Sequence, residues 1–394
     1  MSHIDELLAD YCADGVPYLA LGDAASVSVG TRPGPDLLGG TTHRLWNGGT
    51  QPSGMVDAAN TDGDTVTIPS RGSVGVVGYQ AEPFWCGPLC YRIRSARPDL
   101  LTRFLYFFLK ANQDAVVALQ QTGSIPALNK KELVRLRVPL PPMAVQRELV
   151  RILDVFTDLN IALRDEHQAR LQQYAYYRDS LLAFSEPGSI ARETLDKLGS
   201  LYSGLTGKAK ADFQDGNARF VTYVNVFNNL ATDVAPATLV KVGANERQNR
   251  VRFGDVLFTA SSESAKEVGM ASAVTTDPIE PLYLNSFCFG FRPNDSGELN
   301  PEFTKHLFRS APIRSQIIKT ANGVTRINIS KERFRKIEIP IPAPDEQVRL
   351  AALLDRFEAL TNDPSMGLPA EIRVRQAQYE YYRDMLVTFE ELAA

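Results

Sequence analysis

The chain has 394 residues, with 42 lysine and arginine residues against 46 aspartate and glutamate residues, giving a formal net charge of −4. Its hydrophobic fraction of 44% is ordinary for a globular protein, so we expect two or three folded domains rather than global disorder. No apolar run approaches the roughly 20 residues of a membrane span, and the acidic start is unlike a signal peptide. We therefore expect a cytoplasmic protein, and the mild acidity alone argues against a nucleic-acid ligand.

The first half of the chain predicts a short helix followed by a mixed α+β domain. Helical spacing is seen at the start in Ile4, Leu7, Leu8 and Tyr11. Short apolar segments between Gly, Ser and Pro turns, at residues 74–77 and 89–93, are typical of strands. Residues 100–119 then predict a helix that completes the domain.

A proline-rich joint and a long helix follow this domain. Residues 138–142 read Val-Pro-Leu-Pro-Pro. Because proline fixes φ and removes an amide donor, we expect a stiff extended segment here. From residue 143 to residue 184 apolar side chains recur every three or four positions, which is typical of helices that pack as a coiled coil.

The second half predicts the same order of elements. Strands are expected at residues 220–226, 256–259 and 286–291, and a helix at residues 301–319. A second proline-rich joint follows Ile339, and a second helical pattern starts near residue 344. Residues 362–369 contain two prolines, so we expect the second long helix to be interrupted there.

The two halves are also related in sequence. Residues 130–159 align with residues 331–360 at a constant offset, and the shared positions include Gln146 and Gln347. After a short insertion, residues 170–179 align with residues 375–384. A period of about 200 residues is too long for a solenoid, so the chain predicts two tandem halves, each an α+β domain with a helix.

Motifs for catalysis or metal binding are missing from the sequence. There is no G-x-G-x-x-G, H-E-x-x-H or G-x-S-x-G, and residues 204–208 only superficially resemble a phosphate-binding loop. Cys86 and Cys90 have no second pair of zinc ligands, so we expect buried thiols and no metal site. The missing motifs favour a binding or scaffold protein over an enzyme.

Positive charge is concentrated at matching places in the two halves. Residues 92–137 contain nine basic and three acidic residues, and residues 305–338 contain nine basic and two acidic residues. Two separated cationic patches suit phosphate contacts at two places on one duplex, although solvated charged surface is the alternative. The overall charge of −4 therefore does not exclude DNA as a ligand.

Taken in their order along the chain, the repeated motifs resemble those of the specificity subunits of type I restriction–modification systems, and the resemblance covers essentially the whole chain. The resemblance rests on the duplicated joint and helix: Pro139-Leu-Pro-Pro, Gln146 and Ile152-Leu-Asp, then Pro340-Ile-Pro, Glu346-Gln347 and Leu353-Leu-Asp. Ile4-Asp-Glu-Leu-Leu and Tyr223-Val-Asn-Val-Phe are also similar to family segments.

The resemblance implies an α+β fold with a pseudo-two-fold internal repeat. Two related target-recognition domains would be separated by two long conserved helices that form an antiparallel coiled coil. The implied bounds are an N-terminal helix in 1–14, recognition domains in 15–142 and 187–343, and spacer helices in 143–186 and 344–394. Residues expected in the spacer helices or at a partner interface are Leu149, Phe156, Tyr174, Tyr177, Leu181, Leu350, Phe357, Tyr379, Tyr382 and Leu386.

The resemblance also implies a function and partners. The chain would be a non-catalytic subunit that reads a bipartite double-stranded DNA target and binds two methyltransferase subunits, with restriction subunits in the nuclease form. S-adenosylmethionine would be bound by the methyltransferase, and this chain would bind no cofactor. Two alternatives remain open: an interaction scaffold that never touches DNA, and a stand-alone DNA-modifying enzyme.

Candidate DNA contacts follow from the side chains that can read base edges or grip phosphates. Candidate base contacts in the first domain are Ser70, Arg71, Ser73, Gln120, Gln121 and Ser124. Those in the second domain are Ser261, Ser262, Glu263, Asn322, Thr325 and Arg326. Candidate phosphate contacts are Lys130, Lys131, Lys331 and Arg333, and ordinary turns or surface solubility are the alternative roles.

Overall fold

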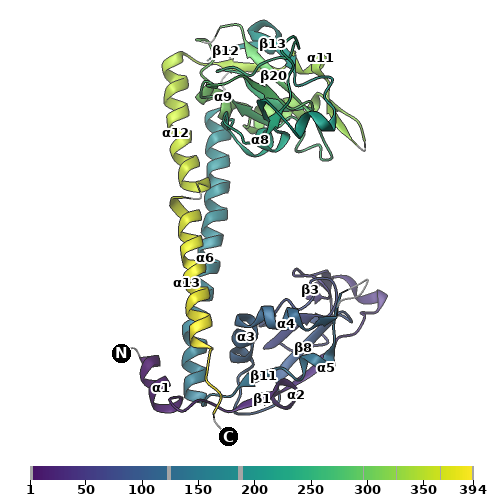
Figure 1. Ribbon diagram of the computed structural model, residues 1–394, viewed down its shortest axis with the longest axis vertical. Helices are drawn as coiled ribbons and strands as arrows, with labels where there is room; N and C mark the ends of the chain where they lie inside the picture. The colour runs from purple at the N-terminus through teal and green to yellow at the C-terminus, as the bar shows by residue number, and fades with distance from the viewer. Residues whose placement is uncertain are drawn as a thin grey trace. The chain divides into compact units, whose positions relative to one another are not determined.

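The structure is a computed structural model that describes residues 3–121, 126–184, 190–295, 297–324, 326–363 and 365–392. The chain forms two compact units: unit 1 contains Met1–Arg164 and Glu371–Ala394, and unit 2 contains Asp165–Ala370. The boundary falls inside two helices, α6 (Met143–Leu181) and α13 (Gly367–Leu386), which are labelled in Figure 1. Each unit therefore combines one α+β domain with helical segments from two parts of the chain.

Unit 1 is built on a four-stranded sheet in the order β2-β8-β5-β6, with a three-stranded sheet β4-β3-β7 and the pairs β1-β11 and β9-β10. The elements of its domain are α1 (His3–Tyr11), β1 (Tyr18–Ala20), α2 (Leu21–Ala24), β2 (Ala25–Val29), β3 (Leu38–Trp46), β4 (Gly54–Val56), β5 (Thr65–Pro69), β6 (Gly78–Gln80), β7 (Trp85–Cys86), β8 (Cys90–Ser95), α3 (Thr102–Ala111), α4 (Gln113–Ala118), β9 (Gln120–Gln121), β10 (Ala127–Leu128), α5 (Lys130–Leu133) and β11 (Arg137–Pro139).

Unit 2 is built on a four-stranded sheet in the order β13-β20-β16-β18, with the sheets β15-β14-β19 and β17-β22-β21 and the pair β12-β23. Its further elements are β12 (Ala191–Thr194), α7 (Leu195–Leu198), β13 (Gly199–Ser203), β14 (Ala218–Val221), α8 (Tyr223–Asn228), β15 (Leu239–Val240), β16 (Val256–Thr259), β17 (Ser261–Ser262), β18 (Ala271–Ala273), β19 (Leu282–Leu284), β20 (Cys288–Pro293), α9 (Pro301–Leu307), α10 (Ala311–Lys319), β21 (Ala321–Asn322), β22 (Ile327–Ile329), α11 (Lys331–Phe334), β23 (Glu338–Ile341) and α12 (Pro344–Asn362).

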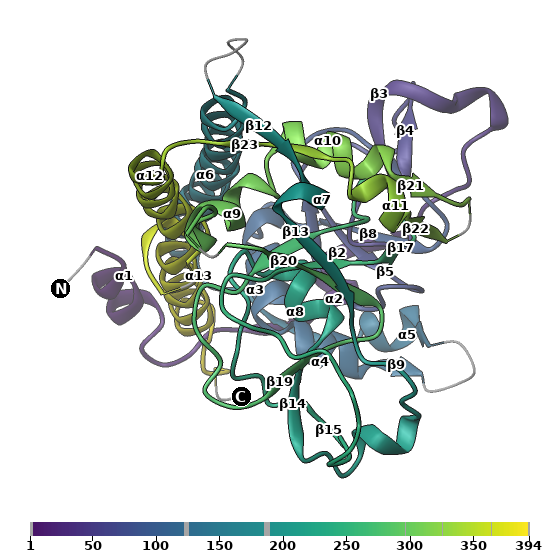
Figure 2. The ribbon, with the colours of Figure 1, turned by 90° about the horizontal axis from the view of Figure 1, so that it is seen from above.

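The cores of the two domains are built in the same way. In unit 1, α3 buries Phe104 and Leu105 in the cluster that contains Val66 and Ile68 of β5. In unit 2, α9 lies between α12 and the four-stranded sheet, as Figure 2 shows, and Phe303 is fully buried. Burying each such side chain contributes about 1.5–3 kcal/mol, so these helices are fixed on their sheets mainly by apolar packing. The prediction of two related α+β domains is confirmed.

Each proline-rich joint forms a strand. β11 pairs antiparallel with β1, where Val138 lies opposite Leu19, and β23 pairs antiparallel with β12, where Ile339 lies opposite Glu193. The extended conformation predicted from the prolines is confirmed. The pairing adds that the chain leaves each domain beside the strand by which it entered.

Several predicted elements were wrong in detail. Residues 74–75 form a turn and residues 76–77 have no regular structure. Residues 220–226 divide into β14 and α8, because the Thr222 hydroxyl accepts a hydrogen bond from Asn225 N and starts a helix. The two domain helices are each broken in two, at Asn112 and at residues 308–310. The first long helix ends at Leu181, three residues before the predicted end.

The predicted interruption of the second long helix is confirmed. α12 ends at Asn362 and α13 begins at Gly367, a break that is visible between the two labels in Figure 1. Across the described residues, no helix combines the length and the apolar character that a membrane crossing requires.

Candidate nucleic-acid interface

In unit 1, the backbone segments that carry several of the predicted base contacts lie next to one another. Leu128 N donates to Ser70 O at 2.9 Å, which joins the loop after β5 to the β9–β10 hairpin. In that hairpin Gln120 lies opposite Leu128 and Gln121 lies opposite Ala127. Ser70, Gln120 and Gln121 therefore belong to one small surface.

The rest of this loop is held by a tight turn. Ser73 N donates to Gly48 O at 2.8 Å, and Gly72 has a φ of +81°, in the left-handed region that favours glycine. Arg71 is exposed at the tip of the turn. Ser124, also predicted as a base contact, lies outside the described residues.

Unit 2 repeats the same connection. Ile329 N donates to Ala260 O at 2.9 Å, so the segment after β16 is joined to the β21–β22 hairpin. Ser261 and Ser262 form β17 and pair with β22, and Asn322 lies across β22 on β21. Thr325, also predicted as a base contact, lies outside the described residues. The same backbone connection between a loop and a hairpin therefore occurs in both units.

In unit 2 the candidate side chains surround a hollow. Arg326 donates from Nη2 and Nε to Ser261 Oγ at 3.2 and 3.4 Å, and its guanidinium carbon lies 5.2 Å from the centre of the Phe287 ring. The hollow has a volume of about 710 Å³, and Ser262 and Glu263 also line it. All four predicted contacts from β17, its following loop and the hairpin turn therefore lie together.

The predicted phosphate contacts differ between the units. Lys130 and Lys131 are exposed on α5, where Asn129 Oδ1 accepts a hydrogen bond from Lys131 N. Lys331 is also exposed, but it donates from Nζ to Ser203 Oγ at 3.2 Å, and desolvation by nearby protein atoms, followed by repulsion from Arg335, lowers the pKa of its ammonium group. The lysines of unit 1 are thus the more available for phosphates.

Arg333 has a partner that the sequence did not indicate. Its Nη2 donates to Asn322 Oδ1 at 2.7 Å, so it orients a predicted base contact. This bond leaves the Asn322 amide nitrogen available as a donor.

Not all of the basic residues counted in the two stretches are surface charges. In unit 1, Arg94 pairs with Asp62 and Arg97 with Asp99. In unit 2, Arg309 is half-buried and Arg314 is buried, and both donate to backbone carbonyls. The cationic stretches are therefore smaller at the surface than their sequence charge suggests.

Comparison with known proteins identifies the family. A family model described as the type I restriction modification DNA specificity domain matches residues 32–173 and 194–374. The chain belongs to this family. The two matched regions contain both hairpins and both of the following joints.

Relatives of known class agree with this assignment. A type I restriction enzyme specificity subunit from Escherichia coli is 31% identical over 264 residues, which span 64% of this chain and only 63% of that subunit. A Haemophilus influenzae protein assigned to the same class of subunit is 26% identical over 348 residues, 85% of each chain. Both relatives are similar to this chain across parts of both halves.

Solved structures of specificity subunits share the fold. The S subunit of the type I system of M. genitalium aligns with a TM-score of 0.54 and 16% identity over 95% of this chain and 96% of that chain. A chain from work on complex assembly and conformational transition of the type I restriction–modification system aligns with a TM-score of 0.61 and 14% identity over the same shares.

The helix residues predicted from the specificity-subunit resemblance are mostly internal to their units. Leu149, Tyr174, Leu350, Tyr379 and Leu386 are buried, and Leu181 packs at the edge of the unit 2 core. Four aromatic side chains form two stacked pairs: Phe156 on Tyr382 with ring centres 5.7 Å apart, and Tyr177 on Phe357 at 5.8 Å. The tyrosine clusters thus supply packing within each unit, while the neighbouring Tyr176 and Tyr381 remain exposed.

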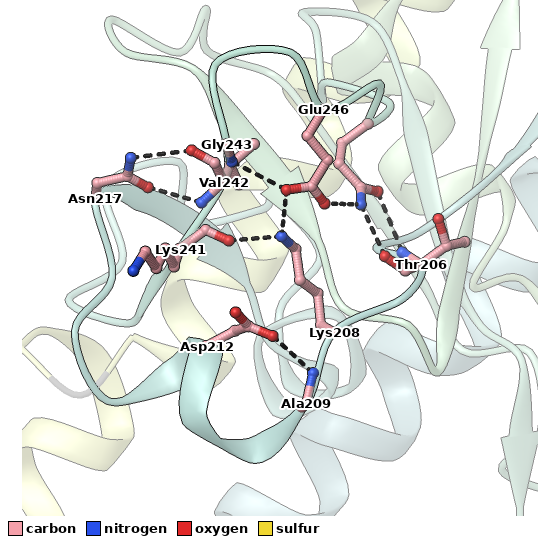
Figure 3. Close-up of polar contacts among 10 residues, drawn as sticks. Thr206, Lys208, Ala209, Asp212, Asn217, Lys241, Val242, Gly243 and Glu246 are labelled. Atoms are coloured by element: carbon pink, nitrogen blue, oxygen red, sulfur yellow. Dashed lines mark hydrogen bonds and ion pairs between the residues drawn. The ribbon is translucent and has the colours of Figure 1, made fainter.

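The sequence that superficially resembles a phosphate-binding loop has a structural role in this specificity-domain protein. Lys208 Nζ donates to Lys241 O and to Glu246 Oε2, each at 2.6 Å, as Figure 3 shows. Hydrogen bonds from Lys208, Gln248 and Gly243 lower the pKa of Glu246 to about 2. Lys208 therefore ties two loops of unit 2 together.

The cysteines and the other metal-binding side chains give no metal centre in the part of the chain that the structure describes. Cys86 and Cys90 are buried, and the Cys86 thiol lies 3.4 Å from Cys90 O. In the described structure they are internal thiols of the β7–β8 region.

Two elements that sequence reasoning missed belong to the candidate interface. α8 lines the hollow of unit 2 with Tyr223, Val224, Phe227 and Asn228, although its sequence predicts a strand. In unit 1, β3 and β4 form an antiparallel ribbon on which Arg44 lies opposite Met55 and both faces are largely exposed. A two-stranded ribbon fits the major groove of DNA, and of the nine residues of β3 five are exposed and four are half-buried.

Proposed function

We propose that this chain is the DNA-reading subunit of a type I restriction–modification complex, in which each unit reads one half of a bipartite duplex target. The observation that carries the proposal is the duplicated site, in which a loop after the central strand is bonded to a hairpin by Leu128 N to Ser70 O and by Ile329 N to Ala260 O. Two related sites in one chain suit two half-sites on one duplex.

We propose further that α6 pairs with α13 and with α12 as an antiparallel coiled coil that sets the unread spacer. In unit 1, Phe156 meets Tyr382 and Arg164 meets Gln376; in unit 2, His167 meets Thr361 and Tyr177 meets Phe357. In both units, later residues of α6 contact earlier residues of the partner helix, which supports the antiparallel direction.

In this proposal, other subunits carry out the methylation and cleavage of DNA. A duplex base must be flipped out of the stack before it is methylated, and two methyltransferase subunits that bind S-adenosylmethionine would supply that step. Restriction subunits would join in the nuclease form, and this chain would be non-catalytic. The naming of its relatives as specificity subunits supports this division of labour.

The proposal is tested by co-expressing the chain with a type I methyltransferase of the same genome and sequencing methylated adenines. We expect methylation at a motif of two short specified blocks separated by a gap of fixed length, and only when this chain is present. Methylation of the same motif without this chain, or modification of DNA by the isolated chain, would contradict the proposal.

A further inference from the structure

The hollow of unit 2 combines exposed apolar side chains with a cation. Val224 of α8 is 62% exposed and Phe287 is 52% exposed, and both line the hollow of about 710 Å³ that Arg326 also lines. Single exposed apolar residues are common on protein surfaces, but two beside one guanidinium form a mixed surface. Such a surface fits the edge of a DNA base pair that carries both a methyl group and hydrogen-bond acceptors.

The Arg326 guanidinium has N–H donors that its bond to Ser261 does not use. Within the described residues, the Arg326 side chain hydrogen-bonds to the Ser261 hydroxyl and makes no ion pair with a carboxylate. A guanidinium has five N–H donors in a fixed fork, so part of the fork remains open while the Phe287 ring supports its plane. Guanine presents two acceptors, N7 and O6, that match such a fork in the major groove.

The helix that lines part of the hollow is held by a half-buried arginine. Arg309 Nη2 donates to Val226 O, Phe227 O and Asn229 O at 3.0, 2.8 and 3.2 Å, and so holds the last turn of α8. Burial lowers the pKa of Arg309 to about 10, so the group stays charged at neutral pH. Val224 is therefore presented on a helix that is held in place before any ligand binds.

A buried arginine, Arg314, holds another part of the lining. Arg314 donates to Lys266 O, Val268 O and Gly269 O at 2.9, 2.7 and 2.5 Å, which holds the loop that follows β17 and carries Glu263 and Glu267. Burial lowers its pKa to about 10 as well. Walls that are ordered in advance reduce the entropy lost on binding, which is typical of a reading surface.

The charges around the hollow favour base edges inside it and phosphates outside it. Glu263 and Glu267 line it and would repel a phosphate, whereas a carboxylate can accept a hydrogen bond from a base amino group. Arg333 is bonded to Asn322 on β21, at the other edge of the small sheet that begins with β17. Cations at that edge complement the backbone of a duplex whose base edges enter the hollow.

We propose that this hollow reads two adjacent base pairs of the target: Arg326 binds a guanine, and Val224 with Phe287 contacts the methyl group of a thymine. The inference rests on the proposed function, because it requires that unit 2 bind duplex DNA. It adds the identity of the bases and of the side chains that select them.

Modified DNA tests the inference without changing the protein. The complex with its methyltransferase is given duplexes in which each thymine of the target is replaced by deoxyuridine, or each guanine by 7-deazaguanine. We expect one thymine whose demethylation weakens binding about 3-fold, as for one buried methyl group. A guanine next to it should weaken binding roughly 10-fold when its N7 is removed.

Protein variants assign the effects to side chains. In Val224→Ala the loss of affinity on replacing thymine by deoxyuridine should be smaller than in the wild type, and in Arg326→Lys the preference for guanine should fall roughly 10-fold. Val348→Ala is the matched control, since Val348 of α12 in the same unit is similarly exposed and does not line the hollow. It should retain both effects.

Failure of the inference and failure of the proposed function give different results. If the complex methylates a bipartite target that lacks adjacent thymine and guanine, or tolerates every deoxyuridine, the reading assigned to the hollow is wrong and the proposed function stands. If the unmodified target is not bound in preference to other DNA, both are overturned.

Discussion

Gln146 and Gln347 make the same three hydrogen bonds in the two units. Gln146 Oε1 accepts from Leu101 N at 2.8 Å, and its Nε2 donates to Asp99 O and Pro141 O at 2.8 and 2.7 Å. Gln347 repeats this with Asn300 N, Glu298 O and Pro342 O at 2.8 to 2.9 Å. Each buried amide thus ties the first turn of a long helix to the segment that precedes a domain helix.

We expect Gln146→Leu to loosen this junction in unit 1 alone. The substitution leaves one buried amide and two carbonyls without partners, which costs about 3 kcal/mol. Hydrogen exchange should therefore quicken at Leu101 and stay unchanged at Asn300, and Gln347→Leu should give the reverse pattern. The exposed Gln172→Ala serves as control; equal exchange at Leu101 in the Gln146 variant and the wild type would contradict the proposed role.

The sequence predicted the repeated framework because its determinants are local. β16 coincides with the predicted strand at residues 256–259, since four consecutive buried apolar or β-branched residues have few other structures available. The prolines after Val138 and Ile339 fixed the extended joints. Matching sequence at Gln146 and Gln347 also pointed to matching structure.

Other features depend on contacts that a sequence does not display. Residues 223–228 have the β-branched and aromatic composition of a strand, but the Thr222 cap and the Arg309 guanidinium at the two ends stabilise a helix. The sequence alone indicated that Arg309 and Arg314 are surface charges. In the structure, both guanidinium groups donate hydrogen bonds to backbone carbonyls. The partner of Arg333, Asn322, follows from the hairpin's position, which the predicted elements did not include.

The exposed lysines of α5 provide a test of phosphate contact. We expect Lys130→Ala with Lys131→Ala to weaken binding of the complex to all DNA sequences alike. If each lysine neutralises one phosphate, the slope of log affinity against log salt should fall in magnitude by about 1.8. Binding measured between low and moderate salt gives the slope, with Arg147→Ala on α6 as an exposed control; an unchanged slope would exclude the phosphate role.

Tyr176 and Tyr381 provide a test of the partner interface. They occupy equivalent positions, are 68% and 65% exposed, and each forms a T-shaped pair with the adjacent tyrosine, with ring centres 5.6 and 5.5 Å apart. Exposed tyrosines are frequent anchors in interfaces, where truncation costs roughly 2 kcal/mol. We expect each single alanine variant to lose one methyltransferase copy at limiting concentration, and the double variant to lose both.

The mass of the purified complex reports this stoichiometry directly. Tyr11→Ala on α1, which is also exposed, should leave the complex intact. Retention of two methyltransferase copies by the double variant would show that the exposed tyrosines are not anchors.

The spacer hypothesis predicts a change in the target rather than in affinity. Matched insertions of four helix-forming residues after Arg164 and after Ala370 fall at the boundary between the units, so contacts within each unit are kept. Each insertion adds about 6 Å of helix. At about 3.4 Å per base pair we expect the unread gap to lengthen by about two base pairs with both half-sites unchanged. Sequencing of methylated adenines measures the gap, and altered half-sites with the original gap would refute the hypothesis.

The Lys208–Glu246 pair makes the loops of unit 2 sensitive to acid. Because hydrogen bonds hold the pKa of Glu246 at about 2, below its ordinary value of 4.5, its contribution to stability is complete above that ordinary value and is lost as the pH falls toward 2. We expect Glu246→Gln to speed hydrogen exchange at Thr206 and Gly243 at pH 7 and to have a smaller effect at pH 3. Asp277→Asn, at an exposed site, should change neither rate. An equal effect of Glu246→Gln at both pH values would show that the charge of Glu246 does not hold these loops.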